Sequence, residues 1–289
     1  MITLQNEHVK VQVKTKGAEL DSIYSKETNL EYLWSGDAKF WSKKSPILFP
    51  IVGTLKENTY YYNNKPYKLT RHGFARDMEF SVTAQDENSA TLTLTDSEQT
   101  LQSFPFPFRL DVVYSLDANS VHVTYKVSNT GADNMYFSVG GHPAFKVPVD
   151  KKLDYHDYYF EFDQTEDAYR WLISSQGLIN PVTVPFLINS NVLHISRELF
   201  RDDALVFKYL NSQKVKLKSD RSKHGVEISF PGFPFLGLWA APNADFVCIE
   251  PWCGIADSTT SNQEFINKEG INLLTPSEIF QRTWSVKVF

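Results

Sequence analysis

The chain has 289 residues, of which 42% are hydrophobic and 22% charged, and its formal net charge is −5. This balance is that of an ordinary globular protein with enough apolar residues for a sizeable core. An acidic chain without a block of basic residues lacks the charge that nucleic-acid binding requires, so we expect no nucleic-acid partner. No apolar run approaches the roughly 20 residues that cross a bilayer, so we expect no membrane partner either.

The number of cysteines and the first residues of the chain indicate the cellular compartment in which the protein is expected. Cys248 and Cys253 are too few for a disulfide scaffold of this size, and no second pair of cysteines completes a zinc site. We therefore expect both as reduced thiols. The first residues have neither the positive segment nor the apolar run of a secretory signal peptide. Together these features predict a soluble, cytoplasmic protein.

Apolar and polar residues alternate with a period of two along most of the chain, which is the pattern of half-buried β-strands. Near the N-terminus the alternation places Val9, Val11 and Val13 on one face. The basic residues within 214–225 fit the same pattern as the solvent face of a strand. Further alternating segments are 89–97, 120–129, 214–219, 225–230 and 283–289.

The connections between these segments contain turn residues and little helical pattern. The two asparagines at 63–64 separate two aromatic runs, and because Asn tolerates a positive φ we predict a tight hairpin there. Residues 96–104 predict one short helix, with Asp96 or Ser97 as its cap and Pro105 as its stop.

No Gly/Ser-rich linker, fixed repeat or low-complexity tract divides the chain. A long chain with many short strands is typical of a large sandwich or barrel. We therefore predict an all-β, mainly antiparallel protein with few short helices, folded as a single domain over residues 1–289.

Three segments break the alternation and carry polar groups that folding does not require. Each group also has a purely structural explanation, since a lone histidine is commonly a hydrogen-bonding group and a surface ion pair contributes little. The groups are Arg71, His72, Arg76 and Asp77 in residues 69–80, His142 in residues 138–148, and Glu250, Trp252 and Asp257 in residues 246–257.

His142 and Glu250 are the strongest candidates for chemistry. His142 follows Gly140 and Gly141, which allow a sharp turn or a close approach of the backbone. Glu250 ends an apolar run that reads as fully buried, and burial would raise the pKa of its carboxyl group toward that of a general base. A histidine and a carboxylate at separate strand ends can act as an acid–base pair if the fold brings them together.

Other chemistries lack their motifs. The chain contains no G-x-S-x-G elbow, no P-loop and no G-x-G-x-x-G segment. Its histidines lack the H-x-H and H-E-x-x-H spacings, so we expect no catalytic metal.

Read together, the segments resemble the aldose 1-epimerase (galactose mutarotase-like) family, and in particular its LacX-type branch. The resemblance covers nearly the whole chain. Any one motif is weak, whereas five in the same order are specific for the family but not for a substrate. The matching segments are "SPILFPIVGTLKENTY" at 45–60, "HGFARD" at 72–77, "GGHPAF" at 140–145, "FPFLGLWAAP" at 233–242 and "EPWCGIAD" at 250–257.

The resemblance implies a large galactose mutarotase-like β-sandwich (a supersandwich) that interconverts sugar anomers without a cofactor. It makes His142 the general acid that protonates the ring oxygen and Glu250 the base that takes the proton from the C1 hydroxyl. His72, Arg76 and, by a looser match, Asp203 would bind the sugar. Trp239 and Trp252 offer flat apolar faces to a sugar, although core packing explains them equally well. The partner is then a small sugar or sugar phosphate.

One residue departs from the family pattern. Thr54 stands where relatives often have an arginine that contacts the sugar, and Lys56 or Arg71 could replace that arginine. Arg71, Arg76 and Lys56 together also allow an anionic sugar phosphate.

Two other functions stay open at this stage. One is a catalytically idle carbohydrate-binding or sensing protein on the same fold, because a fold does not fix a function. The other is a polysaccharide lyase or a glycosidase, whose paired carboxylates would be Glu250 with Asp203 or Asp257. The chain would act as a monomer or a homodimer.

Overall fold

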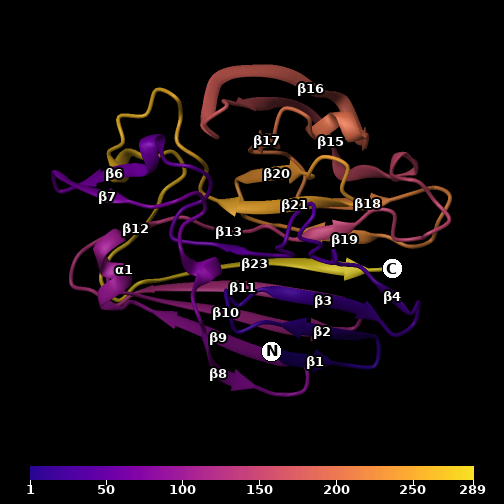
Figure 1. Cartoon of the computed structure of the whole chain (residues 1–289), viewed down its shortest axis with the longest axis horizontal. Coiled ribbons are helices and arrows are strands. Elements are labelled where there is room, and N and C mark those ends of the chain that lie inside the picture. Colours follow the sequence, from indigo (N-terminus) through magenta and orange to yellow (C-terminus); the bar gives the residue numbers. More distant parts are fainter.

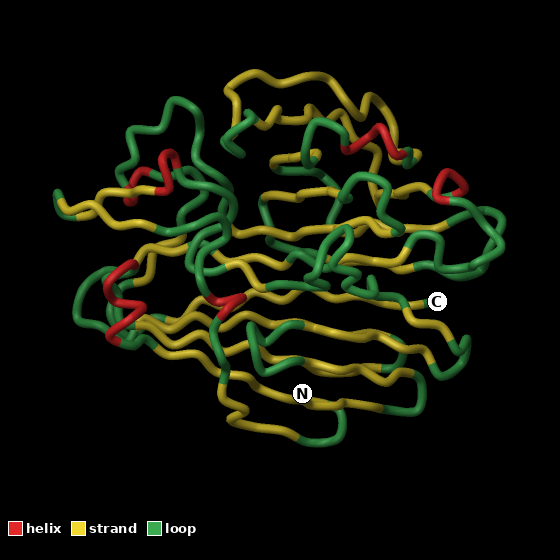
Figure 2. Tube along the Cα trace, in the orientation of Figure 1, coloured by secondary structure: helices red, strands yellow, loops and turns green.

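The computed structural model describes residues 1–289, and strands make up about half of it (Figure 1, Figure 2). Every pairing between two strands of the sheets is antiparallel. The strands form one 15-stranded sheet, one four-stranded sheet and two small ribbons of two strands each. The prediction of an all-β, mainly antiparallel protein is therefore confirmed.

The 15-stranded sheet holds most of the chain. Two strands lie off its main path: β14 (Ala144–Lys146) pairs with β21, and β16 (Ile179–His194) pairs with β15. In order across the sheet, the others are β5 (Ile47–Leu48), β13 (Val139–Gly141), β21 (Phe246–Cys253), β20 (Phe235–Trp239), β17 (Leu205–Lys208), β15 (Tyr159–Ile173), β18 (Lys214–Lys218), β19 (Val226–Ser229), β23 (Ile279–Val288), β11 (Ser120–Asn129), β10 (Phe108–Asp117), β9 (Ser89–Thr95) and β8 (Ser81–Gln85).

The smaller sheets flank this large one. The four-stranded sheet lies beside β8 to β11 in the view of Figure 1, and its apolar residues join the same core. Its strands are β1 (Ile2–Gln5), β2 (Val9–Val13), β3 (Leu20–Ser25) and β4 (Leu30–Glu31). The ribbons pair β6 (Thr59–Tyr62) with β7 (Lys65–Lys68) and β12 (Met135–Phe137) with β22 (Asn272–Leu274).

Helices are few and short. The one α-helix is α1 (Glu98–Ser103), where the predicted helix was placed, and Ser97 caps it by accepting a hydrogen bond from the backbone of Thr100. None of the helices has the length and apolar character that crossing a membrane requires. The 3-10 turns are η1 (Lys56–Asn58), η2 (Ala75–Asp77), η3 (Tyr155–Asp157), η4 (Arg197–Phe200) and η5 (Phe265–Asn267).

The local predictions from alternation and turn residues are confirmed. Val9, Val11 and Val13 are all buried, and β18 alternates exposed or half-buried lysines with a buried face. Asn63 and Asn64 have φ values of 50° and 59° in the hairpin between β6 and β7. A positive φ at both central residues is the geometry of a type I′ turn, which asparagine adopts readily.

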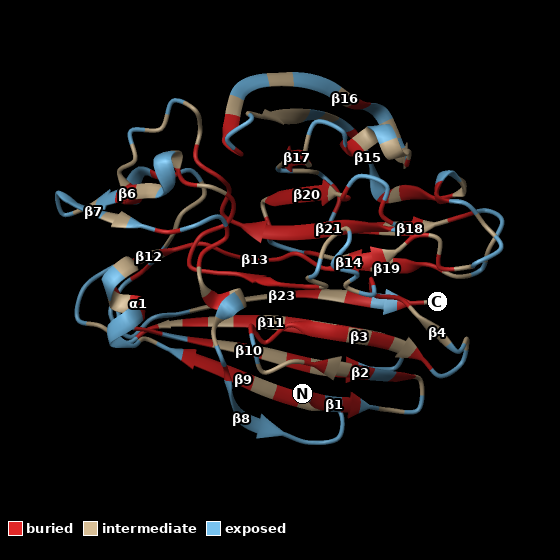
Figure 3. Cartoon of the chain, viewed as in Figure 1, coloured by how far each residue is buried: buried red, intermediate tan, exposed pale blue.

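The core is continuous from one end of the chain to the other. A single cluster of buried apolar residues runs from Ile2 to Val288. Figure 3 shows the buried residues concentrated in the central strands, whereas the outer part of β16 is exposed.

β21 is the strand that positions the site, because all eight of its residues are buried. Successive side chains of a strand point to opposite faces. Val247, Ile249 and Cys253 accordingly enter the main core. Glu250 and Trp252 lie on the other face, where two smaller apolar clusters surround an open cavity.

Candidate active site

The register of the sheet brings His142 and Glu250 together. β13 and β14 both pair with β21, one on each side of His142, and their common register places His142 opposite Glu250. The two side chains meet with His142 Nε2 and Glu250 Oε2 3.2 Å apart. Glu250 lies on β21, and His142 lies between β13 and β14, which both pair with β21, so their relative position is fixed by backbone pairing.

Burial controls the charge of this pair. Glu250 is 1% exposed and His142 is 8% exposed. Burial lowers the pKa of His142 to about 3 and raises the pKa of Glu250 well above its ordinary value, because a charge is disfavoured away from water. Both changes favour the uncharged form of the pair, in which the proton lies on Glu250 and His142 is neutral. Glu250 Oε2 and His142 Nδ1 have no hydrogen-bond partner within the protein, so Oε2 remains available to a bound molecule.

His72 stands next to this pair with one nitrogen already committed. Its ring centroid lies 5.6 Å from that of His142, and the backbone N–H of Gly53 donates to His72 Nδ1 at 3.1 Å. Burial, followed by the nearby His142, lowers the pKa of His72 well below its usual value. A neutral imidazole that accepts at Nδ1 carries its proton on Nε2. His72 can therefore donate a hydrogen bond to an oxygen in the cavity.

Two arginines and one aspartate supply charge at the side of the cavity. Arg71 is half-exposed, and its Nη2 lies 3.5 Å from Oδ2 of Asp203. Arg76 donates from Nη2 to the backbone carbonyl of Arg71 at 2.9 Å, and its buried Nε has no hydrogen-bond partner. These groups can bind hydroxyl groups or an anionic substituent of a ligand.

Tryptophans form the apolar walls. Trp252 lies across two glycines of the neighbouring strands: a Cβ on Gly237 would fall 2.4 Å from its ring, and a Cβ on Gly140 2.8 Å from it. The rings of Trp41 and Trp239 lie 4.9 Å and 5.7 Å from His142, measured between centroids. All three rings line the cavity and present flat apolar surface to it.

The five residues predicted for the site all line this one cavity, whose volume is about 380 Å³. The size is within the range of small-molecule sites. Sequence reasoning missed Trp41, which no motif marks, and the tip of the β15–β16 hairpin, which reaches the cavity through Gly177. The predicted residues in the cavity are His72, Arg76, His142, Asp203 and Glu250.

Of Arg71 and Lys56, the two candidates to replace an arginine at position 54, only Arg71 faces the cavity. Arg71 lines the cavity, whereas Lys56 Nζ donates to the backbone carbonyl of Ser261. Thr54 does not line the cavity, because its Oγ1 lies 2.8 Å from where a Cβ of Gly177 would be. The hairpin tip therefore covers the threonine.

Asp257 does not face the cavity. Lys268 Nζ donates to its Oδ1 at 2.8 Å, and the backbone N–H of Lys56 donates to its Oδ2 at 2.9 Å. Both ionic partners are buried. Asp257 is therefore a structural carboxylate that ties two loops together, which removes it as the second carboxylate of a glycosidase.

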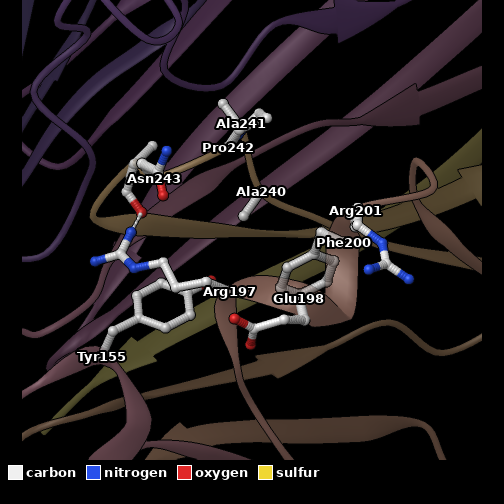
Figure 4. A pocket seen from close by; sticks show the side chains of 10 residues that line it. Tyr155, Arg197, Glu198, Phe200, Arg201, Ala240, Ala241, Pro242 and Asn243 are labelled. Atoms are coloured by element: carbon white, nitrogen blue, oxygen red, sulfur yellow. Dashed lines mark hydrogen bonds between the residues drawn. The ribbon is translucent and has the colours of Figure 1, made fainter.

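A second hollow, of about 230 Å³, lies between η4 and the segment 240–244 (Figure 4). The guanidinium of Arg197, which lines this hollow, already has partners within the protein. It donates to the Ala244 carbonyl and to Asp245, each at 2.6 Å, and lies over the ring of Tyr155. The hollow shares no residue with the His142–Glu250 cavity.

Fold and cavity together define a galactose mutarotase-like β-sandwich with a buried histidine–glutamate pair at the floor of its cleft. The chain matches the family model described as "Aldose 1-epimerase" over residues 1–269, and it belongs to this family of isomerases. It is 33% identical to "Protein LacX, chromosomal" of Lactococcus lactis subsp. lactis, over 99% of each chain.

Two solved structures support the same assignment. A galactose mutarotase related enzyme from Lactobacillus acidophilus superposes with a TM-score of 0.96 at 34% identity, over 100% of this chain and 97% of that one. A galactose mutarotase-like protein from Lactobacillus casei superposes with a TM-score of 0.94 at 29% identity, over all of both chains. The resemblance to the LacX-type branch is confirmed.

Proposed function

We propose that this chain is a cofactor-independent aldose 1-epimerase that interconverts the α and β anomers of a hexose or hexose phosphate. It would act as a single-domain enzyme in the cytoplasm. Its two free cysteines support this compartment, because disulfides are rare there. The observation that carries the proposal is the buried His142–Glu250 pair, 3.2 Å apart at the floor of an open cavity.

The reaction needs one proton removed and one delivered at two different oxygens. Glu250 takes the proton from the C1 hydroxyl while His142 protonates the ring oxygen, and the ring opens. Rotation about the C1–C2 bond and closure on the other face of the carbonyl give the other anomer. Before the sugar binds, burial favours the proton on Glu250, and the 3.2 Å separation allows this proton to pass to His142.

The remaining groups bind and orient the sugar. His72 donates from Nε2 to an oxygen near the ring, and Asp203 accepts hydrogen bonds from hydroxyl groups. Arg76 and Arg71 contact further hydroxyls or the phosphate of a 6-phosphorylated sugar. The rings of Trp239 and Trp252 cover the C–H faces of the sugar, which an apolar wall accommodates better than water does.

The test is anomer-exchange NMR on a panel of free and 6-phosphorylated hexoses. His142→Ala and Glu250→Gln should each lose about 10²- to 10⁴-fold in rate. The chain supplies a matched control in the exposed pair His8–Glu27, whose side chains meet at 2.6 Å in the turns beside the paired ends of β2 and β3. His8→Ala and Glu27→Gln should keep the wild-type rate. An unchanged rate in either cleft variant would refute the assigned roles.

Thr54 favours one alternative, a carbohydrate-binding or sensing protein without catalysis. The covered threonine leaves the cleft without the family's arginine at that position. In that case sugar would shift the NMR signals of the protein, while anomer exchange stayed at the rate of the buffer alone.

A further inference from the structure

The catalytic pair has a third neighbour that epimerisation does not use. One donor atom each of His142, Cys248 and Glu250 lie within 4.8 Å of one another. Cys248 and Glu250 are two residues apart on β21, so their side chains point to the same face. His142 comes from the neighbouring segment opposite them. The cluster is therefore set by strand register rather than by a mobile loop.

Two atoms of this cluster are buried without a hydrogen bond, although one of them, Glu250 Oε2, lies 3.2 Å from His142 Nε2. Glu250 Oε2 and His142 Nδ1 make no hydrogen bond within the protein. A buried polar atom without a hydrogen bond costs about 1–3 kcal/mol, and a catalytic role or a bound water or ion is a common reason for one. The Cys248 thiol is fully buried and lies behind the cavity, whereas His142 and Glu250 line it.

The three donors match the coordination chemistry of borderline-soft divalent metals. Imidazole nitrogen, thiolate sulfur and carboxylate oxygen are the ligands that zinc takes, and open sites use three of them with water in the fourth position. Bond lengths of about 2.0–2.3 Å place two such ligands roughly 3.3–3.8 Å apart. The donor atoms therefore have to approach one another by on the order of 1 Å. A thiolate and a carboxylate also balance the two charges of the ion, which leaves the buried site neutral.

We propose that His142, Cys248 and Glu250 bind a zinc-type divalent transition-metal ion that enters through the cleft. The metal would occupy Glu250 and His142, and so block the proton transfers of the reaction. Binding itself is independent of the proposed epimerase activity, whereas the inhibition rests on it. The ion would act as a reversible inhibitor, not as a cofactor.

The direct test uses Co²⁺ alone as the probe, added to the chelator-stripped full chain. A cobalt ion bound by a thiolate gives a sulfur-to-metal charge-transfer absorption, and we expect one equivalent to produce it and Zn²⁺ to displace it. The band should vanish in Cys248→Ser, which is nearly isosteric and whose folding is checked by thermal unfolding. It should remain in Cys253→Ala, because Cys253 is the other buried thiol and lies on the opposite face of β21.

Ligand loss gives a quantitative criterion. Removing an outer-shell partner typically weakens metal binding about 10- to 100-fold, so removing a ligand should cost more than that. Glu250→Gln and Cys248→Ser should each show this loss by calorimetry with Zn²⁺. No thiolate band in the wild type, or a band that survives in Cys248→Ser, would overturn the proposal.

The inhibition is tested separately, so that the two proposals can fail independently. Zn²⁺ should slow anomer exchange by the wild type, and a chelator should restore the rate. The control variant Cys253→Ala should be slowed by Zn²⁺ and restored by the chelator to the same extent. If the wild type shows no exchange with any sugar, the proposed function fails and the cobalt spectrum still decides the metal site. If Zn²⁺ displaces the cobalt band but leaves the rate of anomer exchange unchanged, the inhibitory role is overturned.

Discussion

His142 and Glu250 lie opposite each other across two paired strands, with Nε2 and Oε2 3.2 Å apart and almost no access to water. Their burial changes both protonation equilibria in the direction of the uncharged form. This relationship makes the pH dependence of the reaction a sharp test of the site.

The rate of anomer exchange should not fall as pH drops through the range in which an ordinary histidine titrates, about pH 5 to 7. The pKa of His142 is lowered to about 3, so the pair gains a second proton and loses its base only near that pH. The pKa of Glu250 is raised, so the pair loses its proton only as pH rises through this raised value. The measurement is kcat/KM against pH, corrected for spontaneous exchange in buffer. A rate that falls as pH drops through about 6.5 would contradict the lowered pKa of His142.

Arg71 should determine the preference for phosphorylated sugars. The guanidinium is half-exposed in the cavity, near Asp203. If it contacts a phosphate, Arg71→Ala should raise KM for a hexose 6-phosphate about 10- to 100-fold, the value of a charge-assisted hydrogen bond, and leave kcat nearly unchanged. KM for the free hexose should change much less.

Arg109→Ala serves as the control, since Arg109 pairs with Asp111 on β10 outside the cavity. KM values that rise equally for both sugars in Arg71→Ala would show that Arg71 does not recognise phosphate.

Gly237 should be irreplaceable because of Trp252. A new methyl group at Gly237 would meet the ring at 2.4 Å, so Gly237→Ala should displace the tryptophan and cost about 1–3 kcal/mol of unfolding free energy. Affinity for the sugar should fall with it, because Trp252 is part of the cavity wall. Urea unfolding and KM measure the two effects. Adding Trp252→Leu to Gly237→Ala should recover stability but not affinity, and a double variant as unstable as the single one would refute the steric cause.

Local sequence patterns predicted the strands well, because alternation depends only on which face of a strand is buried. The same holds for the Asn63–Asn64 turn and for the cap at Ser97. Burial of Glu250 could also be inferred, from the apolar run before it. These features are encoded within a few residues of where they occur.

Contacts between distant segments could not be predicted in this way. Nothing in the sequence shows that Trp41 stacks near His142, or that the tip of a long hairpin covers Thr54. Family motifs identified His142 and Glu250 as partners, but only the register of β13, β14 and β21 explains why they meet. Cys248 joined the cluster for the same reason, and its thiol looks like simple packing in the sequence.

The ion pair of Asp257 and Lys268 gives the last prediction. The side chains are 4% and 2% exposed and meet at 2.8 Å. Removing one partner leaves a buried charge without compensation, so Lys268→Met or Asp257→Asn should each cost about 3–5 kcal/mol of unfolding free energy. The double variant should be more stable than either single one, because no uncompensated charge remains. Since Asp257 also holds the backbone of Lys56 and its own N–H donates to the Thr54 carbonyl, the single variants should loosen the loops beside the cleft. Urea unfolding measures the stability, and additive losses in the double variant would show that the two charges do not stabilise each other.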